Sequence, residues 1–261
     1  GSTVTDPFGA PAATDPGDLG LDNSNNPGSP SPVPNAYFAT PITDDGRWWA
    51  GFGVSAPFGL GSDYGNDFFG GFLSYDAELT TIDFQPTLAY KINDWLSFGA
   101  SAIIEYVDIN FKQFILVSGG GAGATSYATS KLAGDDWSLG YNVGLTIKPY
   151  DKTTVGISYR SKVAHTAKGA FLINGITGNT GDTAAGSLVL PDIATFGLKY
   201  DFNEKWTGLI GANWFGWNSF DDVPIVRDDG GAAPTLDFNY QSTWAYSIGA
   251  EYKYDDEWTF R

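Results

Sequence analysis

Cysteine and methionine are absent from the 261-residue chain, and histidine occurs only once. Without cysteine, a disulfide scaffold, a zinc finger, an iron–sulfur protein and a thiol enzyme are excluded. A single histidine argues against a His-based metal site or a Ser-His-Asp triad. Basic residues are scarce too, because 14 Lys and Arg stand against 30 Asp and Glu, a formal net charge of −16. A nucleic-acid binder needs a basic face, so this balance argues against that class.

The chain also lacks a long hydrophobic run. Nothing approaches the ~20 apolar residues that a spanning helix requires, and glycines interrupt 113–130, the longest uncharged stretch after the N-terminal segment 1–33. No secretory signal opens the chain. A strand of a membrane β-barrel, however, spans with only about 9–11 residues that are alternately apolar and polar. Abundant glycine and 16% aromatic residues favour β-structure.

Strict alternation is the main signal in the sequence. From Ile82 to Ile92 every second residue is apolar or aromatic, and 137–147 and 244–254 repeat the pattern. The intervening positions hold mostly Gly, Ser, Thr and Asn, whereas the alternative fold, a soluble β-sandwich, would place more charge on its solvated face. Trp and Tyr gather at the strand ends, as in the aromatic girdles of membrane barrels. The pattern therefore favours a transmembrane antiparallel β-barrel.

Connections between the expected strands alternate in length. Tight turns such as Asn93-Asp94 alternate with long segments, which is typical of barrels with short periplasmic and long extracellular connections. We expect one partial all-β barrel domain over 1–261, with an extracellular loop at 1–33 and about nine to ten strands over 35–254. The long extracellular loops are expected at 57–80, 112–136, 165–187 and 216–243. Because closed barrels normally have an even strand count and no Met begins the chain, the pattern indicates a fragment.

An ordered set of short stretches resembles the FadL/TodX family of outer-membrane transporters for long-chain fatty acids and other hydrophobic compounds. Each stretch alone is weakly specific, but their order spans nearly the whole chain. The stretches are Val33–Ile42, Pro57–Leu60, Leu88–Gly99, Gly140–Gly144, Tyr159–Ser161, Leu190–Asp192 and Tyr254–Arg261.

The resemblance implies a 14-stranded barrel of which strands two to ten lie within 35–254, without the N-terminal hatch. It implies an outer-membrane location in a Gram-negative bacterium, contact with lipid and lipopolysaccharide, and passive uptake of fatty acids or of aromatic or alkane hydrocarbons. A full-length protein is expected to be a monomer. No catalytic residue, cofactor or metal is expected. The alternatives are a general polar porin and a surface-exposed binding or adhesion module.

Two long segments contain apolar residues that could receive a hydrophobic substrate outside the barrel. The resemblance implies that the two corresponding loops of the family form an external groove, and the alternative is that these side chains only pack the loops together. The candidate ligand-binding residues are Phe111, Phe114, Ile115, Leu116, Val117, Phe171, Leu172, Ile173 and Ile176.

The segment around Pro57 is expected to bend or bulge, because proline removes a ladder donor and glycine admits unusual dihedral angles. By resemblance, an inward kink at this point opens a lateral window through which substrate leaves into the bilayer; the alternative is an ordinary strand end. The candidate residues are Pro57, Phe58, Gly59, Leu60 and Gly61.

A carboxylate substrate would need a cation near its pocket, and Arg160 is the leading candidate. The alternative is that Arg160 pairs with interior acids such as Asp83 or Glu105. Acid pairs such as Asp135/Asp136 are interpreted as solvated turn residues rather than Ca²⁺ ligands. His165 is expected to stand alone.

Overall fold

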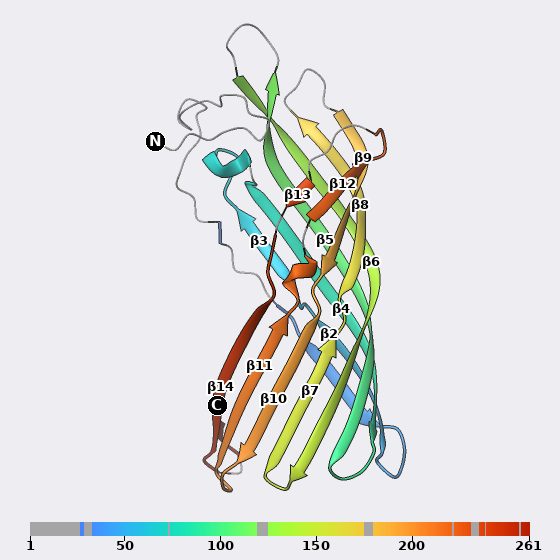
Figure 1. The fold of residues 1–261 in the computed structure, drawn as a ribbon, viewed down its shortest axis with the longest axis vertical. Coiled ribbons are helices and arrows are strands. Elements are labelled where there is room, and N and C mark those ends of the chain that lie inside the picture. The colour runs from blue at the N-terminus through green and yellow to red at the C-terminus, as the bar shows by residue number, and fades with distance from the viewer. Residues whose placement is uncertain are drawn as a thin grey trace.

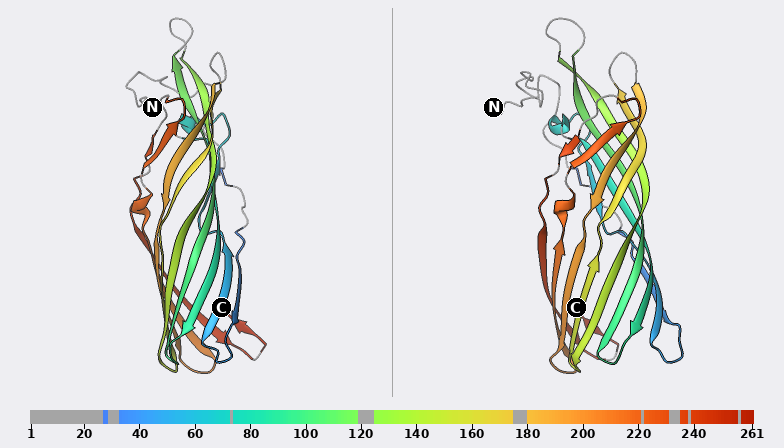
Figure 2. Two further views of the ribbon diagram at one scale, coloured as in Figure 1. Left: turned by 90° about the vertical axis from the view of Figure 1, so that its right-hand side faces the viewer. Right: turned by 45° about the vertical axis from the view of Figure 1, so that its right-hand side comes forward.

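The computed structural model describes residues 27–28, 33–72, 74–118, 125–174, 180–220, 222–230, 235–237, 239–255 and 257–261. Most of the expected loop 1–33 lies outside these residues. The described strands form one twisted antiparallel sheet, curved around a long axis into an open wall (Figure 1, Figure 2). Along the wall the order is β1-β2-β4-β5-β6-β7-β10-β11-β14-β15, and no described pair joins β15 back to β1. The expected antiparallel barrel wall is confirmed, and it is open.

The strands differ greatly in length, from short edge pieces to the 26 residues of β6. No described helix is long and apolar enough to cross a membrane. The elements are β1 (Ala36–Pro41), β2 (Trp48–Ser55), β3 (Gly59–Asp63), η2 (Phe69–Phe72), β4 (Asp76–Lys91), β5 (Leu96–Ser118), β6 (Thr125–Tyr150), β7 (Thr153–Arg160), β8 (Val163–Asn174), β9 (Thr180–Leu190), β10 (Ile193–Asp201), β11 (Trp206–Phe215), η3 (Trp217–Ser219), β12 (Asp222–Arg227), β13 (Thr235–Asp237), β14 (Thr243–Lys253) and β15 (Thr259–Phe260).

The alternating pattern separates the two faces of the wall as expected. On β4 the odd-numbered Thr81 and Asp83 are fully buried on the concave face, whereas Leu88 is 46% exposed on the convex face. Aromatic pairs mark the convex face near the short turns, with ring centroids 4.6 Å apart for Trp48 and Tyr90 and 4.7 Å apart for Trp206 and Tyr252. The apolar face is therefore the one that a bilayer would cover.

Two segments expected to be irregular loops are instead long hairpins. The β5–β6 ladder continues without a break from Leu96 opposite Ile147 to Ser118 opposite Thr125, which covers most of 112–136. The β8–β9 ladder occupies most of 165–187 in the same way. In β8 the two-residue period of burial continues from Val163 to Phe171. The β5–β6 and β8–β9 hairpins project beyond β7, β10 and β11 (Figure 1).

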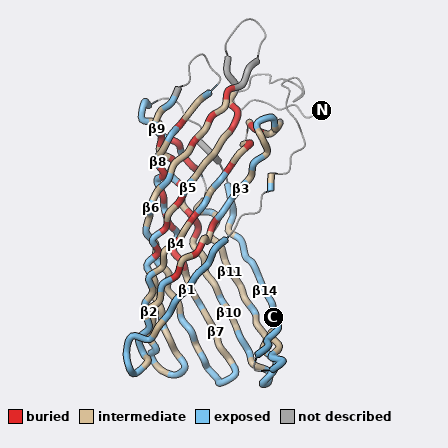
Figure 3. Tube along the Cα trace, turned by 180° about the vertical axis from the view of Figure 1, so that it is seen from behind, coloured by how far each residue is buried: buried red, intermediate tan, exposed pale blue. Residues whose placement is uncertain are grey.

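Two breaks separate neighbouring strands along the chain. β7 ends at Arg160 before β8 begins at Val163, and β9 ends at Leu190 before β10 begins at Ile193, with Pro191 and Asp192 between them. Proline has no N–H for the ladder, which accounts for the second break. Burial concentrates in the half of the wall on the hairpin side of these breaks, while the strands near the short turns remain half-buried or exposed (Figure 3).

Candidate functional site

The wall has an irregular segment where β2 ends and β3 begins, which we call the wall interruption (Ala56–Phe58). Ser55 pairs with Asp83 in the β2–β4 ladder, and Gly59 pairs with Thr80 in the β3–β4 ladder. Three residues therefore stand opposite two, the signature of a β-bulge. Pro57, which has no N–H to donate, lies at its centre.

Thr81 provides the hydrogen bonds of the interruption. The N–H of Phe58 donates to Thr81 Oγ1 at 3.0 Å, and that hydroxyl donates to the Phe58 carbonyl at 2.7 Å. The Thr81 N–H also donates to the same carbonyl, at 3.3 Å. A buried side-chain hydroxyl thus replaces the ladder partner that the bulge removes.

The Phe58 ring points into the interior and is 8% exposed. Its neighbours form the apolar cluster Phe58, Leu188, Leu190 and Val223, with Trp217 partly buried against it. The Phe58 and Trp217 rings meet edge to face with centroids 5.8 Å apart. The interruption therefore places an aromatic side chain against apolar residues from β9 and β12.

A buried charged cluster lies beside the Phe58 ring, and five consecutive strands, β4 to β8, each contribute one of its side chains. Arg160 donates to both Asp83 and Glu105. His165 bridges Glu105 at 3.0 Å and Asp136 at 3.1 Å. The cluster residues are Asp83, Glu105, Asp136, Arg160 and His165. Such networks couple their members strongly because the low dielectric of the interior strengthens each bond.

Two expectations about single residues are wrong. His165 does not stand alone, since both of its ring nitrogens face carboxylates. Asp136 is not a solvated turn residue, because it faces His165 and also accepts the Thr166 N–H at 3.1 Å. Both residues belong to regular alternation on the concave face, so extending the strands to 136 and 165 would have brought them together.

Arg160 is paired with Asp83 and Glu105, as the alternative interpretation expected. Its guanidinium is also 5.6 Å from the centroid of the Phe58 ring. Among the described residues, no hydrogen-bond partner faces its buried Nε. Arg160 therefore has most of its hydrogen-bonding capacity occupied by the protein itself, and a role in binding a substrate carboxylate stays a prediction.

The expected groove residues lie in two separate clusters. Phe171 is buried with Leu132, Ala184 and Ile225, and both Phe111 and Ile173 pack against them. Phe114 lies in a different cluster with Tyr75, Phe68 and Phe72. Ile115 and Leu172 are half-buried, Leu116 and Val117 lie near the end of β5, and Ile176 falls outside the described residues. Packing accounts for Phe111, Phe114, Phe171 and Ile173, and a ligand role for any of the nine stays a prediction.

Replacing Phe114 with alanine is expected to loosen the segment 64–75. The Phe114 ring is 2% exposed and stacks on Tyr75 with centroids 4.8 Å apart, so its loss should cost roughly 3–5 kcal/mol locally. Limited proteolysis of the detergent-solubilised protein should then cut within 64–75 faster. Phe171→Ala, which empties the other cluster, is the matched control. Faster cleavage of 64–75 in both variants would contradict the separation of the two clusters.

Carboxylates also pair with basic side chains in the projecting part of the wall. Lys112 of β5 pairs with Asp76 of β4, and this hydrogen bond raises the pKa of Lys112 above its usual value. Arg227 of β12 pairs with Asp229 and lies near Asp182. The Asp229 backbone N–H donates to Asp182 and lowers the pKa of that carboxyl. These pairs stabilise the projecting hairpins rather than present open cation sites.

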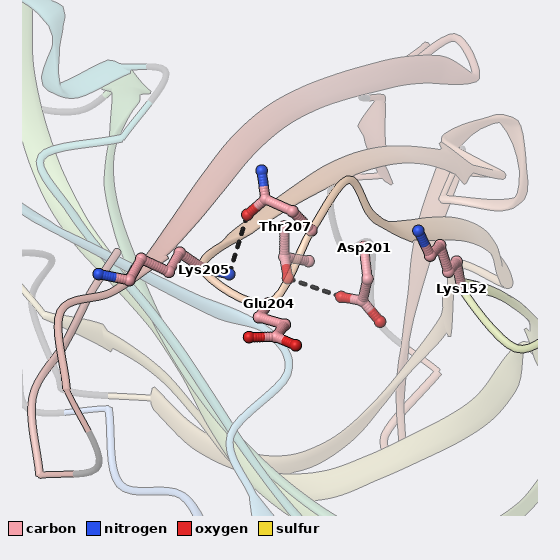
Figure 4. A pocket seen from close by; sticks show the side chains of 6 residues that line it. Lys152, Asp201, Glu204, Lys205 and Thr207 are labelled. Carbon is pink, nitrogen blue, oxygen red and sulfur yellow. Dashed lines mark hydrogen bonds between the residues drawn. The ribbon is translucent and has the colours of Figure 1, made fainter.

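A polar hollow lies at the opposite end of the wall, at the turn between β10 and β11 (Figure 4). Its lining includes Lys152, Asp201 and Lys205, and Thr207 donates a 2.6 Å hydrogen bond to Asp201. The Lys205 N–H donates to Asn203 Oδ1 and closes the turn. Its polar lining does not suit a hydrophobic substrate. The candidate site is therefore the wall interruption together with the apolar cluster around Phe58 and the charged cluster around Arg160.

An antiparallel wall with an apolar convex face, aromatic strand ends and a small-residue concave face defines the class of transmembrane β-barrels. The chain belongs to the family of outer membrane protein transport proteins (OMPP1/FadL/TodX), whose model matches residues 3–261. The resemblance noted in the sequence is thereby confirmed.

Several relatives are named for transport. The chain is 24% identical over 271 residues to a long-chain fatty acid transport protein of Escherichia coli O6:H1, covering 92% of this chain and 60% of that protein. It is similar to the crystal structure of a Pseudomonas aeruginosa FadL homologue, with a TM-score of 0.80, 25% identity and coverage of 87% of this chain and 58% of the other. The Ralstonia pickettii toluene transporter TbuX shares the fold, with a TM-score of 0.69, 23% identity and coverage of 86% and 66%. The chain thus spans about three-fifths of the length of the first curated relative.

Proposed function

We propose that the natural protein containing this chain lies in the outer membrane of a Gram-negative bacterium, in contact with lipid and lipopolysaccharide. There it takes up hydrophobic small molecules by passive diffusion, as a monomeric barrel without cofactor or enzymatic activity. Its substrates are long-chain fatty acids or aromatic or alkane hydrocarbons. Family membership and the relatives named for fatty acid and toluene transport support this proposal.

The observation that carries the proposal is the wall interruption. A regular ladder would seal β2 and β3 against β4, but Ala56–Phe58 leave the register and send Phe58 to the apolar cluster. An apolar contact that reaches the wall at a break in the ladder suits a route for a hydrophobic molecule between the interior and the bilayer. A polar porin would instead line this level with hydrated side chains.

The test is uptake by cells that produce the natural protein, comparing radiolabelled oleate and toluene with an empty-vector strain. Uptake of at least one of them above the vector control is expected, with uptake of a small sugar unchanged. Normal sugar entry together with vector-level uptake of both oleate and toluene would rule out hydrophobic transport.

A further inference from the structure

The interruption is held from two directions by side chains that the alternation places on the concave face. Phe58 is bound at its N–H and its carbonyl by Thr81, which is itself fully buried. On its other side the Phe58 ring lies over the Arg160 guanidinium. A side chain fixed through both its backbone and its ring has little freedom to leave its place.

The charged cluster is also linked to the start of the interruption. Gln85 Nε2 donates to Ser55 Oγ at 3.1 Å and to Asp83 Oδ2 at 3.2 Å. Asp83 in turn accepts from Arg160. A continuous chain of contacts thus runs from Ser55, the last residue of β2, through the cluster to the ring of Phe58.

The same contacts bear on whether Arg160 is free to bind a substrate carboxylate. Its guanidinium faces two carboxylates from β4 and β5, and both are fully buried. The carboxylates of the cluster therefore neutralise its charge, and an incoming substrate carboxylate would have to displace one of them. A cation held in this way serves to orient its neighbours.

We propose that Thr81 and Arg160 are positioning residues for the wall interruption: together they hold Phe58 inward and keep Ala56–Phe58 out of the β-ladder. This inference rests on the proposed function, in which the interruption forms the route for substrate. Arg160 then acts equally on charged and neutral substrates, because it shapes the route and does not bind the cargo.

The first test compares Thr81→Val with Thr87→Val in the natural protein. Both threonines lie on the concave face of β4, but the Thr87 hydroxyl bonds Ser101 and the Gln85 carbonyl, away from the interruption. Amide hydrogen exchange of a peptide containing residues 56–59, measured in lipid nanodiscs, should accelerate about tenfold in Thr81→Val. It should stay at the wild-type rate in Thr87→Val. Unchanged exchange in Thr81→Val overturns the proposal.

The second test replaces Arg160 with methionine and uses Arg47→Met, at an exposed turn pair with Asp45, as the control. Oleate and toluene uptake, divided by the amount of folded protein in the membrane, should fall by the same factor in Arg160→Met and in Thr81→Val. A loss confined to oleate would make Arg160 a ligand for the carboxylate and overturn the proposal. Faster exchange without any loss of uptake would overturn it too.

With Thr81→Val and Arg160→Met together, the proposal can still be tested if one variant misfolds or if the proposed function is wrong. Thr81→Val leaves every charge in place, so it decides the question if Arg160→Met does not fold. If wild-type cells take up neither substrate, the proposed function fails, while the exchange comparison of Thr81→Val with Thr87→Val still decides whether Thr81 holds the interruption.

Discussion

Replacing Ile210 with arginine is expected to destabilise the membrane-inserted protein by roughly 2–4 kcal/mol. Ile210 lies midway along β11, between Trp206 and Trp214, and is 52% exposed on the convex face. If the aromatic strand ends mark the two membrane interfaces, this position falls near the centre of the bilayer. A guanidinium there has neither water nor a described partner to solvate it.

The adjacent Leu209 provides the control, because neighbouring strand residues point to opposite faces. Leu209 pairs in register with Lys199 and Gly249 on the concave face, so Leu209→Arg should cost much less. Reversible urea unfolding of the natural protein in phosphatidylcholine vesicles measures both free energies. Equal losses for the two variants would show that the convex face is not the one in contact with lipid.

Much of the fold could be predicted from the period of two. Alternation distinguishes the two faces of β4, because the odd-numbered residues Thr81 and Asp83 are buried while Leu88 is exposed, and a slip of one residue would reverse every side chain. The turn residues Asn93 and Asp94 similarly predict the tight β4–β5 connection, where Asn93 Oδ1 accepts the N–H groups of Trp95 and Leu96. These signals are local, so a sequence reveals them directly.

The charged cluster could not be predicted in the same way, because it depends on the register between strands. Asp83, Glu105 and Arg160 are far apart in sequence, and they meet because Asp83 pairs with Glu105 and Arg160 with Asn142 across separate ladders. Alternation predicts only that each faces inward. The pairing of His165 with Asp136 is missed for a different reason: both residues fall in segments expected to be loops, although the alternation of the neighbouring strands extends through them.

Substituting Glu105 with alanine is expected to lower the free energy of unfolding by roughly 3–5 kcal/mol. Glu105 is fully buried and links Arg160 to His165. Without it, Arg160 keeps only Asp83 and His165 keeps only Asp136, so a buried guanidinium N–H and a buried imidazole nitrogen each lose a hydrogen-bond partner. Asp108→Ala, which removes an exposed carboxylate from the same strand, should change the stability little in the same urea titration.

The loss of unfolding free energy should be smaller when the charged residues of the cluster are replaced together. Uncharged residues of similar volume often replace a buried ion cluster at little cost, so the combined variant Asp83→Asn, Glu105→Gln, Arg160→Met is expected to regain most of the stability that Glu105→Ala loses. A combined variant as unstable as Glu105→Ala would contradict this explanation. Because it still lacks the guanidinium against Phe58, the combined variant should remain poor in uptake of both oleate and toluene. Restored stability without restored uptake would separate the two effects of the cluster: stabilising the fold, and positioning the interruption.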